Sequence, residues 1–249
     1  MSQRSNFKIY PLLIMGLFLV FTSNCKKDDN SPDNPNDYNE VGGFNPNVTY
    51  GTMTDQDGNE YKTVKIGNQT WMAENLRTTK YRDGSAIPVV SSKTAWVGLT
   101  TGAYCNYNNT ASADTINAFG RLYNWYAATD ARNIAPTGWH VPTDDDWTIL
   151  TDYLGGEDVS GDKIKETGIT HWFSANLSTT NETGFTARPG GYRNNDGVFY
   201  SVGKNGYWWS TTESTPSNAW FRYVSNLYSN MGSLYGNAAV GFSVRCVKD

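Results

Sequence analysis

The chain has 249 residues, of which 38% are hydrophobic and 18% charged, so it is long enough to bury the core of one ordinary domain. Its 20 basic and 24 acidic residues give a formal net charge of −4. This balance excludes nucleic acid as a partner, because no basic stripe is available to displace phosphate counterions.

Residues 1–24 have the layout of a lipoprotein signal peptide. Two basic residues precede an apolar run over residues 9–21, which is too short to span a bilayer comfortably, and Cys25 follows it. We therefore expect Cys25 to be lipidated and to anchor the chain in a lipid bilayer. An ordinary cleaved signal with an incidental cysteine is the alternative, and Thr22 and Asn24 depart from the usual cleavage pattern.

The next segment, residues 25–47, is rich in Asn, Asp and Pro and contains little apolar material, which predicts a disordered tether. Residues 26–29, Lys-Lys-Asp-Asp, resemble the signal that sends Bacteroidetes lipoproteins to the outer face of the outer membrane. We therefore expect an outer-membrane, lipid-anchored protein exposed at the cell surface, in preference to a periplasmic one. The folded domain is expected over residues 48–249.

The domain begins with strand patterns at 48–54, 60–66 and 70–72. The turn at 55–59 places Asp, Asp and Asn like the first three ligands of an EF-hand loop, but its glycine stands at the fourth position instead of the sixth. A hairpin turn explains the Asp-Gly pair fully, so calcium is not expected there.

The first helix is predicted over residues 118–130. Leu122, Trp125 and Tyr126 fall on one face at helical spacing. An aromatic stripe of this kind could be a ligand platform, but we interpret it as core, because such rings bury large apolar areas.

The second helix is predicted to begin after Thr143. Thr143 and Asp146 have capping-box spacing, and three carboxylates stand in the first turn, where the helix dipole favours negative charge. An apolar stripe follows, and Gly155 is expected to end the helix. The remaining strands are predicted at 139–141, 185–188, 198–202, 207–212, 219–224 and 240–247.

Six runs carry a resemblance to a known family, and they occur in the family's order: GRLYNWYAA, PTGWHVPTDDDW, YLGG, GFTARPGGYR, YWWSTTES and GFSVRCVKD. Over residues 64–249 the chain resembles the Fibrobacter succinogenes major paralogous domain family. That family is similar in turn to the formylglycine-generating-enzyme and C-type-lectin-like folds. The resemblance implies an α+β fold with two helices packed on short, twisted antiparallel strands with long loops, in a surface protein of Bacteroidetes-type bacteria with no assigned activity.

Cys105 and Cys246 are the cysteines left once Cys25 is assigned to lipid, and in an exported chain they are expected to form a disulfide. Two free thiols, or a copper-binding pair like that of formylglycine-generating enzymes, are the alternatives. His140 and His171 lack the close spacing of a zinc motif, and we expect His140 to be a hydrogen-bonded core residue.

No motif selects a catalytic residue. The chain contains no GxSxG elbow, and a helix N-terminus explains the carboxylates at 144–146 without glycosidase chemistry. We therefore expect a non-enzyme that uses no cofactor and no metal.

The aromatic surplus, 9 Trp and 16 Tyr, is the remaining functional signal. Neighbouring residues on a strand point to opposite faces, so Trp208 and Trp209 cannot both be buried on one face. We predict an exposed surface for extracellular polysaccharide; the alternatives are a protein-binding or adhesive module, or a sheet covered on both faces. The calcium-dependent lectin motifs EPN, QPD and WND are absent. The predicted ligand-binding residues are Tyr207, Trp208, Trp209, Trp220 and Arg222.

Overall fold

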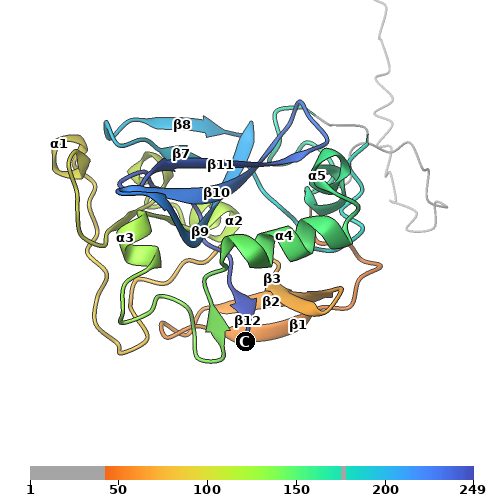
Figure 1. Cartoon of the computed structure of the whole chain (residues 1–249), viewed down its shortest axis with the longest axis horizontal. Coiled ribbons are helices and arrows are strands. Elements are labelled where there is room, and N and C mark those ends of the chain that lie inside the picture. The colour runs from red at the N-terminus through yellow and green to blue at the C-terminus, as the bar shows by residue number, and fades with distance from the viewer. Residues whose placement is uncertain (1–42, 175–177) are drawn as a thin grey trace, which may run out of the picture. The chain divides into compact units, whose positions relative to one another are not determined.

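Strands in several antiparallel sheets form the framework of the domain (Figure 1). The computed structural model describes residues 43–174 and 178–249, with 32% strand against 18% helix. The expected α+β, C-type-lectin-like fold is therefore wrong, because paired strands and not a pair of helices organise the core. The signal peptide over 1–24, Cys25 and the tether up to residue 42 lie outside the described residues.

A five-stranded antiparallel sheet joins the two ends of the domain. The strand nearest the C-terminus lies between two others, so that Val247 pairs with Trp71 on one side and His140 on the other. The expected strands near 60–66, 70–72 and 139–141 are confirmed. In spatial order the sheet contains β1 (Gly51–Thr54), β2 (Glu60–Ile66), β3 (Gln69–Met72), β12 (Val247–Lys248) and β6 (Trp139–His140).

The longest strands form a second, three-stranded sheet in the order β11-β10-β9. The third of its strands was not predicted, because its sequence MGSLYGN carries Gly232 and Gly236, which weaken a strand interior. The rings of Tyr223 and Phe221 on the neighbouring strand lie over these glycines and provide the missing packing. The strands are β9 (Asn205–Thr215), β10 (Asn218–Ser225) and β11 (Met231–Asn237).

Two small ladders lie beside these sheets, and the C-terminal segment runs between them. Residues 240–247 were expected to form one strand, but Phe242 bridges to Tyr123 and Gly241 bridges to Arg193 before β12 begins. The strand expected at 185–188 is also wrong, since only an isolated bridge forms there. The ladders are β4 (Tyr104–Cys105) with β5 (Leu122–Tyr123), and β7 (Gly190–Arg193) with β8 (Phe199–Val202).

Helix α4 (Asp144–Tyr153) begins as predicted. The Thr143 hydroxyl accepts from the Asp146 N–H at 3.1 Å, and the Asp146 carboxylate accepts from the Thr143 N–H at 2.9 Å, which completes the capping box. Trp147 and Leu150 are buried, so the apolar stripe faces the core as expected.

The helix predicted over 118–130 is wrong. Gly120 has a φ of 72° and packs against Asn75, which ends one helix, and the chain then forms β5. The Asn124 side chain accepts from the Ala127 N–H at 3.0 Å and starts a new helix. The segment therefore contains α2 (Ala113–Phe119), β5 and α3 (Trp125–Ala128).

Helix α5 (Glu157–Ile164) was not predicted, because it contains a glycine. A Cβ at Gly161 would overlap the carbonyl oxygens of Ser229 and Asn230, so the loop after β10 packs directly on the helix backbone. The two remaining helical segments are α1 (Lys93–Trp96) and the 3-10 helix Tyr107–Asn109.

Aromatic residues fill two core clusters on either side of the C-terminal segment. One contains Trp209, Phe221 and Phe242, and the other contains Trp71 and Trp208. Most of the tryptophans therefore serve packing. Among the described residues, no helix combines the length and the apolar character needed to cross a membrane.

Candidate functional site

Trp208 and Trp209, the centre of the predicted ligand surface, are both fully buried. They point to opposite faces of β9, as neighbours on a strand must, and belong to different core clusters. Each indole N–H is satisfied, that of Trp208 by Asn75 Oδ1 at 2.8 Å and that of Trp209 by the Tyr123 carbonyl at 2.8 Å. Neither residue can therefore contact a ligand as predicted, and the alternative of a sheet covered on both faces holds at this point.

Arg222 is also buried, with 4% of its surface exposed. Its guanidinium contacts the Asp144 carboxylate in the first turn of α4 and donates to Ser233 Oγ at 2.7 Å, so it joins the sheet to the helix. Trp220 is half-buried and packs edge-on against Tyr235 at a centroid distance of 5.6 Å. Of the predicted ligand residues, only Tyr207 and Trp220 reach the surface.

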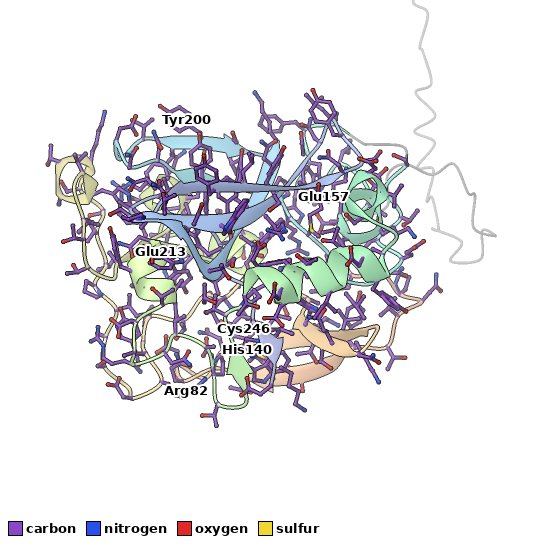
Figure 2. The ribbon with its side chains drawn as sticks, viewed as in Figure 1. Arg82, His140, Glu157, Tyr200, Glu213 and Cys246 are labelled. Atoms are coloured by element: carbon purple, nitrogen blue, oxygen red, sulfur yellow. The ribbon has the colours of Figure 1, made fainter. Side chains whose placement is uncertain are left out.

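Tyr207 is part of a row of four tyrosines that runs across four strands. Tyr200 on β8 stacks on Tyr192 of β7 at 5.4 Å, Tyr192 meets Tyr207 of β9 at 5.0 Å, and Tyr207 stacks on Tyr223 of β10 at 6.1 Å. Three of the rings are half-buried, and Tyr200, labelled in Figure 2, is 40% exposed. We call these four residues the tyrosine strip.

The backbone beneath the tyrosine strip keeps its rings flat. A Cβ at Gly232 on β11 would overlap the ring of Tyr223, so only glycine lets that ring lie across the strand. Under Tyr207 the ring of Phe242 lies nearly parallel, with an interplanar angle of 11° at 5.2 Å. The rings of Tyr192 and Tyr207 therefore rest on Phe242 and remain partly exposed.

Polar groups border the rings. The Asn205 side chain donates to the Tyr207 hydroxyl at 2.7 Å. Partial burial raises the pKa of Tyr192, and the neighbouring Tyr207 and Tyr200 act in the same direction, so the hydroxyl keeps its proton at neutral pH. The strip combines flat aromatic faces with hydrogen-bonding hydroxyl and amide groups, which suits a ligand with one apolar and one polar face.

Sequence reasoning found Tyr207 but missed Tyr192, Tyr200 and Tyr223. They come from three further strands whose order in space is not readable from the chain. The sequence offered only local signs of these residues. Tyr192 follows two glycines in β7, and Tyr200 lies in the strand that follows an Asn-Asp-Gly turn.

His140 is hydrogen-bonded as predicted, but it is not a core residue, since 38% of its side chain is exposed. Its Nδ1 lies 2.7 Å from Asp249 Oδ1 and its Nε2 lies 3.2 Å from Asp146 Oδ2. Within residues 43–174 and 178–249, no group of three or more His, Cys, Asp or Glu could hold a metal ion.

Cys105 and Cys246 are both buried free thiols, so the expected disulfide is absent from the structure. The two residues belong to different core clusters. Cys105 packs with Trp96, whereas the Cys246 N–H lies 3.2 Å from the Met72 sulfur. Because the two side chains face different core clusters, the thiols do not meet.

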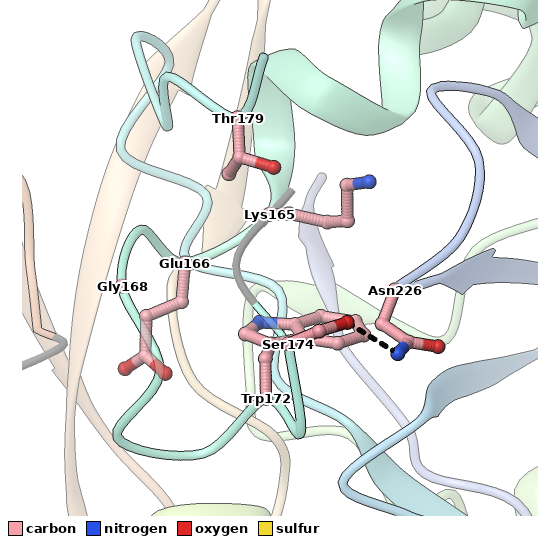
Figure 3. Close-up of a pocket in the computed structure, with 7 residues that line it drawn as sticks. All are labelled: Lys165, Glu166, Gly168, Trp172, Ser174, Thr179 and Asn226. Carbon is pink, nitrogen blue, oxygen red and sulfur yellow. Dashed lines mark hydrogen bonds between the residues drawn. The ribbon is translucent and has the colours of Figure 1, made fainter. Parts of the chain in front are cut away.

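A small cavity beside α5 is lined by Lys165, Glu166 and Trp172 (Figure 3). The buried Glu166 carboxylate lies 2.6 Å from His171 Nδ1 and 2.7 Å from Arg188 Nε, so its charge is compensated. The cavity volume is about 10 Å³, which is room for one water and too little for a sugar ring. It is not a ligand site.

Comparison with known proteins assigns the chain to a family. The family model of the Fibrobacter succinogenes major domain matches residues 64–248. No curated protein and no solved structure matches the chain, and the expected similarity to formylglycine-generating enzymes and C-type lectins is not confirmed. Because the family model covers most of the sequence and nearly all of the folded domain, the chain belongs to the Fibrobacter succinogenes major domain family.

Proposed function

We propose that this protein is a non-catalytic binding module that a lipid on Cys25 holds at the bacterial cell surface, and that the tyrosine strip is its contact surface for extracellular glycans. The half-exposed row of Tyr192, Tyr200, Tyr207 and Tyr223 carries the proposal. The apolar C–H face of a pyranose packs on an aromatic ring, while its hydroxyl groups reach hydrogen-bonding partners beside the ring.

Rigidity supports a binding role. Tyrosine supplies a large contact area with only two side-chain torsions to fix, and the rings of the strip are already packed on Phe242 and on one another. Little conformational entropy is therefore lost when a ligand binds. A row of rings across four strands suits an extended chain of sugars better than a single one.

The binding experiment is a panel of plant and host polysaccharides tested against the purified chain. Tyr200→Ala should lower affinity for the strongest polysaccharide about tenfold. It should lower the free energy of unfolding by about 1 kcal/mol, because the residue is 40% exposed and its main ring contact is Tyr192. Tyr153→Ala is the matched control, since Tyr153 is 65% exposed and lies at the end of α4, outside the strip.

A protein-binding or adhesive module without glycan affinity is the competing function. If this function is correct, no polysaccharide should bind. The chain should instead capture a protein partner, and the Tyr200→Ala variant should fail to capture it. Equal polysaccharide binding by Tyr200→Ala, Tyr223→Ala and the parent chain would remove the strip from the proposal.

The anchor is tested separately. In detergent-phase partitioning, the Cys25→Ala variant should appear in the aqueous phase. Retention of this variant in the membrane fraction would place the anchor elsewhere. Protease added to intact cells should remove the domain. Protection until the outer membrane is opened would place the protein in the periplasm.

A further inference from the structure

Three large apolar side chains lie exposed on loops beside α5. Phe173 and Leu227 are each 69% exposed, and Tyr228 is 62% exposed. We call these three residues the apolar loop cluster. Exposed apolar residues grouped in this way mark interaction surfaces more often than residues scattered singly.

Hydrogen bonds hold the loops of the cluster together. The Phe173 N–H donates to the Gly203 carbonyl at 2.8 Å, and the Asn226 N–H donates to the Lys204 carbonyl at 2.8 Å. The Asn226 side chain donates to Ser174 Oγ at 2.8 Å, the bond drawn in Figure 3. Hydrogen bonds therefore hold together the residues that neighbour the exposed side chains.

A buried ammonium group keeps Leu227 and Tyr228 facing outward. Lys165, with 1% of its surface exposed, donates to the carbonyls of Ser225 at 3.1 Å and Tyr228 at 2.7 Å. Its charge is balanced by Asp162 at 2.8 Å. These two bonds hold the backbone of the loop while the side chains of Leu227 and Tyr228 stay exposed.

The described chain begins on the same side of the molecule. The Asn45 side chain donates to the Asn181 carbonyl at 2.9 Å, and the Asn181 N–H donates to the Asp162 carbonyl at 3.4 Å. The N–H of the same Asp162 donates to the Ser229 carbonyl at 3.1 Å. One residue of α5 thus connects the segment that leads toward Cys25 with the loop that carries Leu227 and Tyr228.

We propose that the apolar loop cluster contacts the lipid bilayer in which the chain is anchored, with Phe173, Leu227 and Tyr228 inserted at the interface. This inference rests on the lipid anchor of the proposed function. A chain of the length of residues 25–43 spans at most roughly 68 Å when fully extended, which limits the distance between the domain and the bilayer. The described chain begins on the side of the cluster.

The chemistry of the cluster fits a lipid interface. Phenylalanine and leucine side chains enter the boundary between headgroups and acyl chains, and tyrosine is enriched at the level of the headgroups. Lys204, exposed beside the cluster, supplies a positive charge for anionic headgroups. Contact through the cluster would fix the orientation of the domain, which a single acyl anchor leaves open.

Vesicle co-sedimentation tests the proposal with the lipid-free chain from Lys26 to Asp249, so the result does not depend on acylation of Cys25. Vesicles of phosphatidylethanolamine with phosphatidylglycerol should bind this chain. The triple variant Phe173→Ser, Leu227→Ser, Tyr228→Ser should bind at least tenfold more weakly. The matched control is the double variant Val89→Ser, Val97→Ser, whose side chains are 65% and 54% exposed near α1 and should leave binding unchanged.

A fluorescent reporter tests the same contact without the triple variant, in case that variant misfolds. A tryptophan placed by Phe173→Trp should shift its emission to the blue when vesicles are added, whereas one placed by Val97→Trp should not. Equal vesicle binding by the parent and triple variant, or an unshifted Phe173→Trp emission, would overturn the proposal. A dimer that Leu227→Ser dissociates would assign the cluster to a second copy and overturn it equally. Tyr200→Ala should bind vesicles normally, which separates this result from the glycan test.

Discussion

At the scale of single residues, the side chain of Asn75 joins several segments of the core. Its Oδ1 accepts from Trp208 Nε1 and from Arg245 Nε, both at 2.8 Å. Its Nδ2 donates to the Phe119 carbonyl at 2.8 Å and to Ser243 Oγ at 3.2 Å. All four hydrogen-bonding positions of the amide are in use, so the residue fixes the positions of segments that are distant in the sequence.

Replacing Asn75 by Ala should therefore lower the free energy of unfolding by about 3 kcal/mol, because a buried indole N–H and a buried guanidinium lose their acceptor. Urea denaturation of the variant measures the loss. Asn195→Ala, in an exposed turn, is the control and should change stability by under about 0.5 kcal/mol. A loss no larger than that of the control would mean that water replaces the amide.

The two thiols provide a second residue-scale prediction. Burial raises the pKa of Cys105 to about 12 and raises that of Cys246 as well, so neither forms the reactive thiolate near neutral pH. In a chain carrying Cys25→Ser, a thiol reagent should react with no cysteine in the folded protein. Two should react after unfolding without reductant, and none would mean that a disulfide forms after all.

At the scale of single residues, the sequence predicted to which face of a strand a side chain points, but not whether that side chain is exposed. The alternation of Trp208 and Trp209 follows from strand geometry alone, and it is confirmed. Their burial depends on Asn75 and Tyr123, which are 133 and 86 residues away, and nothing local shows that these residues cover the strand.

At the scale of elements, the start of α4 is encoded locally, and its capping box has a predictable dependence on pH. Burial acts to raise the pKa of Asp146, but hydrogen bonds from Thr143 and His140 outweigh it, so the pKa lies below its usual value. Because the native pKa is lower than the unfolded value of about 3.9, the stabilisation is present above about pH 4. It is lost as the pH falls through the native pKa.

Asp146→Asn should accordingly lower the free energy of unfolding by about 1 kcal/mol at pH 7. The difference from the parent chain should shrink as the pH falls below about 4. Denaturation curves at several pH values between 7 and 3 measure it. Asp145→Asn is the control in the same helical turn, since Asp145 is exposed and makes none of these hydrogen bonds. A difference that persists unchanged at pH 3 would show that the charge of Asp146 is irrelevant to the cap.

Gly232 on β11 links an element to the proposed function. Ala at this position would overlap the outer end of the Tyr223 ring and force this partly exposed ring to shift, so stability should fall by about 1 kcal/mol. The ring would no longer lie flat, and polysaccharide affinity should fall severalfold. Gly236→Ala is the control, because its Cβ would approach Phe221 at 3.2 Å and would not touch the tyrosine strip. Unchanged affinity in Gly232→Ala would remove Tyr223 from the contact surface.

Two of the elements that sequence reasoning missed, β11 and α5, share one physical cause. β11 and α5 contain glycines that lower local propensity, and each glycine is required by a partner from elsewhere in the chain. Gly232 accommodates a ring of β10, and Gly161 accommodates the loop after it. The reverse error, a single helix over 118–130, came from an amphipathic pattern that Gly120 interrupts.

At the scale of the whole described domain, the C-terminal segment closes the fold. Phe242, Val244 and Cys246 alternate into one core cluster, while Arg245 points the other way and lies over the ring of Phe185 at 4.2 Å. The segment then becomes β12, which Figure 1 shows beside the strands from the start of the domain. Sequence patterns predicted a closing strand, but the isolated bridges that this segment makes to the two small ladders and to β9 depend on the assembled fold.

The last three residues should therefore be essential to stability although they end the chain. Removing residues 247–249 deletes β12, the only link between β3 and β6 in the five-stranded sheet of the described residues, together with the pair between Asp249 and His140. Burial of Val247 contributes about 2 kcal/mol, and each lost ladder bond adds about 1 kcal/mol, so the loss should reach at least about 4 kcal/mol.

Thermal unfolding followed by near-UV circular dichroism should show a transition that is lowered by more than about 10 °C or is no longer cooperative. Lys248→Ser is the control, because Lys248 is exposed and its backbone can still pair. If the truncated chain melts within a few degrees of the parent, β12 merely lies against a sheet that is complete without it. A large loss would instead show that folding must await the last residues, since β3 and β6 are separated by most of the first half of the domain and are joined only through the C-terminal strand.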